Sequence, residues 1–524
     1  MALGRGPSPE MTATETESGI APAARREKPG WRQAAAMLRR VISQNLLFSA
    51  AFALAVVFRV IVMLGYLPAV LFRLDTYDYL WDAVHLGPNP VNTSGYALFL
   101  ALLRPFHSLA LIAALQHVMG LAIAVMIYAL LRSWGVSRWL ATLAACPVLF
   151  DPAQMLLEHL VMADILSLFL VITAFTLVLI RRSASPPLWR LMLGGLAMGA
   201  SAIVRPTTLP LVVALAVYLL GTRVGWRRAG AVLVAGALPV AGYMAWFASV
   251  YGSFNMTNSD GLFLWSRTMS FANCGTISPP PDLRALCPTA QPGPLAQPVA
   301  AKRPAPRVYL WDHSAWMWRQ SPASFVPDTA AFTGANNARA RQFAIKAITA
   351  QPLAYADIVA KGALAPFLHT NLFRFPTAQE RGLEVASARQ YAQVAVRDYT
   401  DSSDMPFLGW HYSDTERQPY AHLVGDYQRF VFLPGPLFGL IMLIAVAGFV
   451  IPRRRTAAGI LLWVSAGIIL VLPVAEHEYT YRYAIPAVPL VCMAAALAFR
   501  RNRDDEPQRD TAEKRPPATE PEPA

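Results

Sequence analysis

Residues 45–72 read NLLFSAAFALAVVFRVIVMLGYLPAVLF, and the chain then runs into DTYDY at residues 75–79. The first stretch is long enough to cross a hydrocarbon core of about 30 Å, for which a helix needs roughly 17 to 25 apolar residues. The second stretch places two carboxylates where the chain leaves the apolar run. Together they predict a membrane-spanning helix followed by a short acidic loop at the membrane surface.

The composition of the whole chain agrees with a membrane protein. Of its 524 residues, 55% are hydrophobic and only 15% are charged, whereas a soluble globular protein has about 25% charged residues. The net charge of +13 does not indicate nucleic-acid binding, because most arginines lie in short loops between apolar runs, where positive charge sets membrane topology. The predominance of arginine over lysine and the abundance of alanine and proline are typical of a bacterial coding sequence.

Apolar runs separated by arginine-containing loops predict an all-α integral membrane protein with about ten transmembrane helices. The expected spans are residues 45–72, 107–131, 139–150, 155–180, 188–204, 208–220, 229–250, 430–451, 456–474 and 483–499. With this count, every loop that carries clustered arginines falls on one side of the membrane, as the positive-inside rule requires. We therefore expect a multi-pass plasma-membrane protein with both termini in the cytoplasm.

The same pattern predicts the domain organisation. Residues 251–428 are far longer than an ordinary connection and are expected to form a large extracytoplasmic loop domain, with helical spacing over about 337–374. The other expected segments are a disordered cytoplasmic tail (1–43), an N-terminal transmembrane module (44–250) with its first external loop (73–106), a C-terminal transmembrane module (429–500) and a second disordered cytoplasmic tail (501–524).

The cysteines fit this topology. Cys274 and Cys287 both lie in the expected external domain, where oxidation is favoured, and they are expected to form a disulfide. Cys146 and Cys492 lie in apolar spans and are most simply core residues. No histidine or further cysteine lies near the first pair at the spacing of a metal site, so no metal site is expected there.

Ionisable residues inside or beside membrane spans are rare and usually functional, because a charge at the bilayer centre costs at least about 2.5 kcal/mol. In this chain most of them fall at the outer ends of the expected spans. They are Arg59, Asp75, Asp78, Glu158, His159, Asp164, Arg205, Glu476, His477, Glu478 and Arg482. Distant parts of the sequence thus converge on one membrane face, which favours chemistry at the extracytoplasmic surface.

Two of these charges are expected deeper in the bilayer. Arg59 lies about ten residues inside the outer end of the first span, and Asp164 a similar distance inside the fourth, at about 1.5 Å per residue. An isolated buried charge is expensive. The sequence therefore predicts a buried ion pair between Arg59 and Asp164.

Five segments, taken in order, resemble the GT-C glycosyltransferases, a class that includes protein O-mannosyltransferases and the lipid A aminoarabinose transferase. They are DTYDYLWDA at 75–83, SGYALFLALL at 94–103, EHLVMAD at 158–164, IVRP at 203–206 and EYTYRYAIP at 478–486. The chain departs from the pattern at two points. Many relatives have Asp-Glu where this chain has Asp75-Thr76, and the usual proline before Gly-Tyr is Ser94. These departures leave open the subfamily and which acid is the base.

The resemblance implies a GT-C-like bundle that takes a sugar from a polyprenyl-phosphate donor and transfers it to a hydroxyl of a protein, lipid or cell-wall glycan. A carboxylate within hydrogen-bond reach would deprotonate the acceptor, with Asp75 as first candidate and Asp78 as second. Arg205 and Arg482 would bind the phosphate through their guanidinium forks, and a single displacement would invert the sugar. The other polar motif residues expected to contribute to substrate binding are Glu158, His159, Asp164, Glu478 and Tyr481. No nucleotide-binding loop is visible, and a divalent metal is compatible with the reaction but not required.

Simpler interpretations stand beside this one. The loop acids are also compatible with solvated surface residues, the two arginines with interfacial anchors, and Glu158 with a helix cap. A transporter or flippase of lipid-linked sugars usually keeps polar sites near the midplane on broken helices, and a noncatalytic membrane scaffold needs no converging charges. The sequence does not specify the sugar, the acceptor, the polyprenol length or the oligomeric state.

Overall fold

The computed structural model describes residues 36, 39–40, 42–181, 186–297, 303, 305–319, 331–368, 374–375 and 416–500. The chain divides after Leu46 into two units, and the fold is that of the second unit, residues 47–524. The two predicted disordered tails, and residues 376–415 of the predicted external domain, lie largely outside the described residues. Within the described residues the regular structure is helical, apart from one parallel bridge between Val70 and Leu160.

Several helices have the length and apolarity of membrane spans. Four qualify singly, namely α2 (Leu46–Gly65), α5 (Leu109–Ser133), α11 (Trp226–Tyr251) and α21 (Ala457–Glu476). Two bent pairs raise the number to six if each pair is one span: α6 (Arg138–Phe150) with α7 (Pro152–His159), and α19 (Tyr420–Phe430) with α20 (Gly435–Val450). The described part of the chain therefore has the apolar helices of a membrane protein.

The predicted number of ten spans is not confirmed, because four of the expected spans form shorter helices. They are α8 (Ala163–Leu179), α9 (Leu188–Val204), η2 with α10 (Pro206–Thr208 and Pro210–Gly221), and α22, η6 and α23 (Tyr481–Ala484, Ile485–Ala487 and Val488–Leu497). A helix of 17 residues, such as α8, is only about 26 Å long. The expected span over 155–180 is wrong as one helix, since α7 ends at His159 and α8 begins at Ala163.

The chain also bends where Asp151-Pro152 follows α6. The bend between α6 and α7 is 52°, and it is not a full reversal of direction. The Asp151 side chain accepts a hydrogen bond from the N–H of Ala153 (2.9 Å), which caps α7, and Pro152 occupies the first helical position. Proline is favoured there because its missing N–H would have no partner in the helix.

The acidic stretch at 75–79 was predicted as a loop, and this prediction is wrong. These residues lie in α3 (Arg73–His85), which is followed by α4 (Gly95–Leu103) and η1 (Arg104–Phe106). The spacing explains the difference, because residues three and four apart share one face of a helix. Tyr79, Leu80 and Ala83 are buried, so α3 packs onto the rest of the unit and does not run free at the surface.

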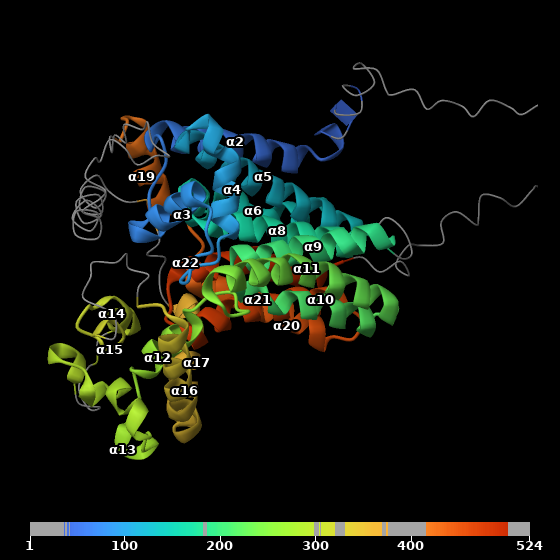
Figure 1. Cartoon of the computed structure of the whole chain (residues 1–524). Helices are drawn as coiled ribbons and strands as arrows, with labels where there is room; N and C mark the ends of the chain where they lie inside the picture. Colours follow the sequence, from blue (N-terminus) through green and yellow to red (C-terminus); the bar gives the residue numbers. More distant parts are fainter. Residues whose placement is uncertain are drawn as a thin grey trace, which may run out of the picture. The chain divides into compact units, whose positions relative to one another are not determined.

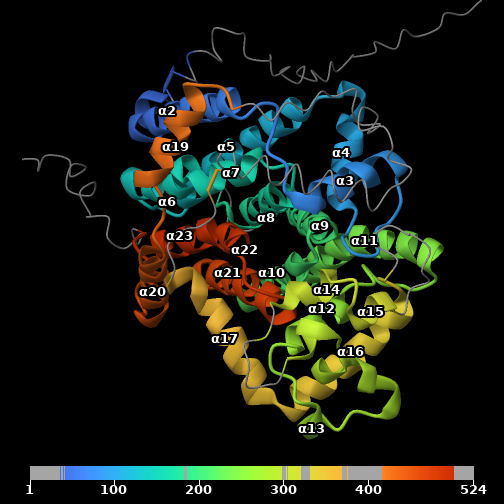
Figure 2. The same cartoon turned by 90° about the vertical axis from the view of Figure 1, so that its left-hand side faces the viewer.

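The long helices pack against one another along their length. Figure 1 shows α5, α6, α8, α9, α11 and α21 running side by side, and Figure 2 views them roughly along their axes. Their shared core is almost entirely aliphatic and aromatic, with Phe175, Ile123 and Leu215 fully buried. Hydrophobic burial contributes roughly 25 cal/mol per Å², although helices facing lipid gain mainly from close packing.

Most of the helices between α11 and α19 form a second core. They are α12 (Asp260–Thr268), α13 (Cys274–Ile277), η3 (Pro281–Leu286), η4 (Pro288–Ala290), η5 (Gly293–Ala296), α14 (Pro306–Trp311), α15 (Trp316–Arg319) and α16 (Gly334–Ala350). Trp265, Trp316 and Phe343 are buried in this core. The next helix, α17 (Pro352–Leu368), packs against α20 and α21. The predicted helical spacing over 337–374 corresponds to α16 and α17.

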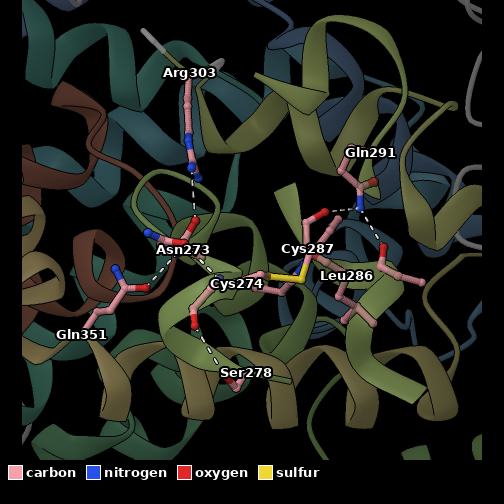
Figure 3. Close-up of a disulfide and its surroundings, with 12 residues drawn as sticks. Asn273, Cys274, Ser278, Leu286, Cys287, Gln291, Arg303 and Gln351 are labelled. Carbon is pink, nitrogen blue, oxygen red and sulfur yellow. Dashed lines mark hydrogen bonds between the residues drawn. A yellow bond between two sulfur atoms is a disulfide. The ribbon is translucent and has the colours of Figure 1, made fainter. Parts of the chain in front are cut away.

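A disulfide joins the predicted pair Cys274 and Cys287 within these helices. Figure 3 shows the bond with Asn273 and Gln351 beside it. Asn273 caps α13 by accepting a hydrogen bond from the N–H of Gly275 (3.0 Å), and its own N–H donates to Oε1 of Gln351 (2.8 Å). The disulfide therefore joins α13 to the end of η3, and the bond from Asn273 to Gln351 connects α13 to the junction between α16 and α17.

Two sets of hydrogen bonds attach these helices to one end of the long-helix bundle, the end at which α3 and α22 also lie (Figures 1 and 2). The N–H of Asn258 donates to the carbonyl of Pro90 (2.8 Å), and the Tyr355 hydroxyl donates to the carbonyl of Ala475 (3.1 Å). His477 lies 3.3 Å from the Ser266 hydroxyl. Burial, followed by the nearby arginines, lowers the pKa of His477 to about 4, so this ring is neutral at pH 7.

A buried ion pair joins α2 to α7. Arg59 donates from Nε to Oε2 of Glu158 and from Nη2 to Oε1, both at 2.8 Å, and it also donates to the carbonyls of Val148 and Leu149. The predicted pair between Arg59 and Asp164 is therefore wrong in its partner. The depth argument assumed one straight helix over 155–180, whereas the break after α7 turns Asp164 away and leaves Glu158 beside Arg59.

Gly120 of α5 makes room for this carboxylate. A Cβ added at Gly120 would lie 1.9 Å from Oε1 of Glu158, so Gly120→Ala must displace a buried, ion-paired side chain. We expect this variant to lower the melting temperature by several degrees, as a broken buried pair costs about 3–5 kcal/mol. Thermal unfolding of the purified protein in detergent measures the change.

Gly242→Ala is the matched control, since a Cβ at Gly242 of α11 meets nothing within 4 Å. Alanine there should leave the protein unchanged or slightly more stable, because glycine is the poorer helix former. Equal melting temperatures for the two variants would show that Glu158 does not occupy the space beside Gly120.

Candidate active site

Four charged side chains from distant parts of the sequence meet at one place. They are Asp75 of α3, Asp164 of α8, Arg205 at the end of α9 and Arg482 of α22. Arg482 lies between the two acids, with its Nη1 3.3 Å from Oδ2 of Asp75 and its Nε 3.9 Å from Oδ1 of Asp164. Arg205 forms an ion pair with the same Oδ1 of Asp164. The formal charges of the four groups cancel.

The four side chains differ in their access to solvent. Asp164 and Arg482 are only 1% and 9% exposed, Arg205 is 19% exposed, and Asp75 is 40% exposed. Asp75 is therefore the carboxylate that an incoming polar molecule can reach, while Asp164 lies behind the arginines. Oδ2 of Asp164 and Nε of Arg482 are buried and have no hydrogen-bond partner among the described residues. Such unsatisfied atoms are costly in a native structure.

Aromatic rings line the arginines. The guanidinium carbon of Arg482 lies 4.6 Å from the ring centre of Phe72 and 5.1 Å from that of Tyr483, and Arg205 lies 5.0 Å from Tyr483. Cations are attracted to the faces of such rings. Burial, with a smaller contribution from Asp75, raises the pKa of Tyr79, although the two arginines oppose this shift. The phenol of Tyr79 therefore stays protonated at neutral pH.

Each of the four charges lies where a helix begins or ends. Asp75 is in the first turn of α3 and Asp164 in the first turn of α8, where a carboxylate interacts favourably with the helix dipole. Arg205 is extended between α9 and η2, and Arg482 is in the four-residue helix α22. The same interruptions that shorten the apolar helices thus bring these polar residues together.

The motif Ser94-Gly95-Tyr96 explains how α4 reaches the end of α9. A Cβ on Gly95 would lie 2.3 Å from the carbonyl oxygen of Ile203, two residues before Arg205. Only glycine permits this approach of α4 to the backbone. The N–H of Ser94 donates to the Tyr243 hydroxyl of α11 (3.3 Å), which fixes the start of α4 from the other side.

Four of the other predicted site residues have contacts elsewhere in the described part of the chain. Glu158 and His159 are fully buried in the Arg59 network, where His117 bridges them at 2.9 and 3.1 Å. Tyr481 packs against Ala153 and Leu157. Glu478 lies 3.9 Å from Arg307 of α14. Asp78 is half-buried on α3, one turn after Asp75.

Several residues at the site were not predicted from the sequence. Phe72, Tyr79 and Tyr483 lie close in the sequence to predicted charged residues. That closeness was the signal that could have identified them as site residues. Asp82 belongs to the segment DTYDYLWDA but was not predicted as a site residue. It lies seven residues after Asp75 and therefore on the same face of α3. Its Oδ2 accepts a hydrogen bond from the Asn89 side chain (2.9 Å).

The described residues offer no group of three or more His, Cys, Asp or Glu side chains that could hold a metal ion. At the charge cluster the carboxylates of Asp75 and Asp164 already face guanidinium groups, which repel a cation.

No family model and no curated protein matches the chain. Two solved structures are similar to it, both of the Archaeoglobus fulgidus oligosaccharyltransferase, one in the apo form and one tethered through a disulfide to an acceptor peptide with an NVT sequon. Their identities are 12% and 13%, and the TM-score is 0.35 for each. The matches cover 86% of this chain but 50% and 49% of the oligosaccharyltransferase chains, so this chain spans about half their length.

The carboxyl of Asp82 makes the stability depend on pH. Burial, which outweighs the hydrogen bond from Asn89, raises its pKa from 3.8 to about 7. The folded protein thus favours the protonated acid, and this contribution is complete below pH 4 and is lost as the pH rises to about 7. We expect Asp82→Asn to gain melting temperature relative to the wild type as the pH is raised from 5 to 8.

Asp357→Asn serves as control, because Asp357 is exposed on α17 and forms only a surface pair with Lys361. Its melting temperature should follow that of the wild type at every pH, since exposed pairs contribute little. A constant difference between Asp82→Asn and the wild type across this range would contradict the assignment.

Proposed function

We propose that this protein is an integral-membrane glycosyltransferase that moves a sugar from a polyprenyl-phosphate donor to an acceptor hydroxyl at the extracytoplasmic face of the plasma membrane. The observation that carries the proposal is the meeting of Asp75, Asp164, Arg205 and Arg482. Asp75 is the most accessible of the four side chains, and Asp164 is the most buried and contacts both arginines. The proposal includes a GT-C-like bundle in which the shorter apolar helices complete about ten spans.

The chemistry follows from the groups present. The acceptor oxygen attacks the anomeric carbon as Asp75 takes its proton, the bond from that carbon to the phosphate oxygen breaks, and the lipid phosphate leaves with the bonding electrons. A positioned general base contributes roughly 10²–10⁴-fold to such a step. Because attack and departure occur on opposite sides of the carbon, the configuration of the sugar inverts. Asp78, one turn further along α3, remains the second candidate for the base.

The two arginines suit the leaving group. A phosphate that departs as an anion needs charge neutralisation, and guanidinium groups provide it with paired hydrogen bonds. Arg482 pairs with Asp75, so a donor phosphate that binds Arg482 would compete with Asp75 for this cation. That exchange would free the Asp75 carboxylate for the acceptor as the donor binds.

The location of the disulfide supports the extracytoplasmic face. Disulfides form and persist in oxidising compartments, and Cys274 and Cys287 lie in the chain segment from α12 to α17. At the two ends of this segment, Asn258 bonds to the loop before α4 and Tyr355 bonds to the end of α21. These attachments lie at the end of the bundle that holds α3 and α22, which carry Asp75 and Arg482.

One observation favours a second candidate, a transporter or flippase of lipid-linked sugars. Asp164, Arg205 and Arg482 lie at interruptions of apolar helices, as polar residues of transporters often do. The two candidates differ in their product. A transferase breaks the bond between sugar and phosphate, whereas a flippase moves the donor across the bilayer intact.

The test is sugar release or transfer from synthetic polyprenyl-phosphate hexoses and pentoses by the purified protein in nanodiscs, with crude membrane acceptors or water as the acceptor. We expect Asp75→Asn to reduce kcat by roughly 10²–10⁴-fold with little change in melting temperature, because the Asp75 side chain is partly exposed. Asp78→Asn, on the same helix, should retain most of the activity.

Asp357→Asn again provides the control for a lost surface carboxylate. The reverse pattern, with activity lost in Asp78→Asn and kept in Asp75→Asn, would move the role of base to Asp78. Translocation of intact donor by the wild type in liposomes, without any release of sugar, would favour the flippase.

A further inference from the structure

We infer that Thr76 is a positioning residue that holds Asp75 and Asp164 in register, and that Gln116 supports it from α5. The inference rests on the proposed function for its kinetic readout, and on the structure alone for its geometric readout. It concerns the interruption between α7 and α8, residues 160–162, where the carbonyls of Leu160 and Val161 are bonded by side chains of other helices.

Thr76 connects the backbone segments that carry the two acids. Its hydroxyl accepts a hydrogen bond from the N–H of Phe72 (2.8 Å) and donates one to the carbonyl of Val161 (3.1 Å). Phe72 is the N-cap residue just before α3, and its side chain makes no capping hydrogen bond. One buried hydroxyl therefore fixes the start of the helix that carries Asp75 and a carbonyl three residues before Asp164.

Two backbone bonds complete this junction. The N–H of Val70 donates to the carbonyl of His159 (3.2 Å), and the N–H of Val161 donates to the carbonyl of Val70 (3.2 Å). The segment between α2 and α3 thus pairs with the interruption for a single residue. A pairing this short does not set the register alone, because each such bond contributes only about 1 kcal/mol.

Gln116 holds the same interruption from the opposite side. Its Nε2 donates to the carbonyls of Glu158 (2.9 Å) and Leu160 (2.7 Å), while its Oε1 accepts from the Tyr96 hydroxyl (2.7 Å). Gln116 and Tyr96 are fully buried. Both polar atoms of the Gln116 amide are therefore hydrogen-bonded, and its two donated bonds hold the backbone at the end of α7.

This arrangement separates positioning from chemistry. Among the described residues, the hydrogen bonds of Thr76 and Gln116 reach backbone groups and the Tyr96 hydroxyl, and none of them reaches Asp75, Arg205 or Arg482. A loss of either side chain nevertheless changes where Asp164 holds the arginines. Misplacement of reacting groups by about 1 Å can cost 10²-fold in rate. The expected signature is a fall in kcat with an unchanged KM for the donor.

The experiment compares Thr76→Val, which keeps the shape and removes the hydroxyl, with Thr76→Ser, which restores it. With the polyprenyl-phosphate sugar that the wild type uses, we expect Thr76→Val to lower kcat at least 10-fold, KM to stay within about twofold, and Thr76→Ser to recover most of the rate. Thr93→Val is the matched control, because the Thr93 hydroxyl is equally buried and has no hydrogen-bond partner among the described residues.

Electron cryo-microscopy of the wild type and Thr76→Val in nanodiscs supplies the second readout. We expect the contact between Asp75 and Arg482, 3.3 Å in the wild type, to be lost in Thr76→Val and kept in Thr93→Val. If Thr76→Val does not fold, Gln116→Met takes its place, since it removes both bonds to the interruption at similar volume.

The outcomes are distinct. Wild-type kcat together with an intact Asp75–Arg482 contact in Thr76→Val overturns the inference, as does an equal loss of rate in Thr93→Val. A wild type that releases no sugar from any donor refutes the proposed function, while the contact seen by microscopy still decides the role of Thr76.

Discussion

A charged side chain buried among apolar helices is costly unless it is paired, and pairing with opposite charges organises this structure. Arg59 is paired with Glu158, and Asp164 with Arg205 and Arg482. The pairing depends on an interruption of the apolar helices, since a continuous helix over 155–180 would place Glu158 and Asp164 on the same straight helix. Because the chain breaks between α7 and α8, Glu158 pairs with Arg59, and Asp164 pairs with Arg205 and Arg482.

The two charge groups differ in what they can do. The Arg59 group is closed, because its carboxylate is fully buried and bonded to Arg59, His117 and Gln154, so it serves stability. The Asp75 group is open on one side and has unsatisfied atoms on the other. A site with one solvent-accessible carboxylate, and with buried polar atoms that have no hydrogen-bond partner among the described residues, is suited to binding a polar ligand. The proposed chemistry is assigned there for this reason.

Much of this was predictable from the sequence, and the failures have physical causes. The apolar runs predicted the helices, the arginines between them predicted a membrane protein, and the two cysteines outside the apolar runs predicted the disulfide. The convergence of Asp75, Arg205 and Arg482 followed from their shared position at the outer ends of apolar runs. Periodicity could not show that α8 starts afresh after residues 160–162, because those residues are as apolar as a helix interior, and the partner of Arg59 was misassigned for that reason.

The most direct test of the charge cluster is a double-mutant cycle on Asp164 and Arg205, with Asp164→Asn, Arg205→Gln and both together, measured by unfolding in detergent. The structure predicts that each single variant loses several kcal/mol, about 3–5 for a broken buried pair, and that the double variant loses less than the sum by at least about 1 kcal/mol. Strictly additive losses would mean that the two side chains do not interact, and the site assembled around them would not exist.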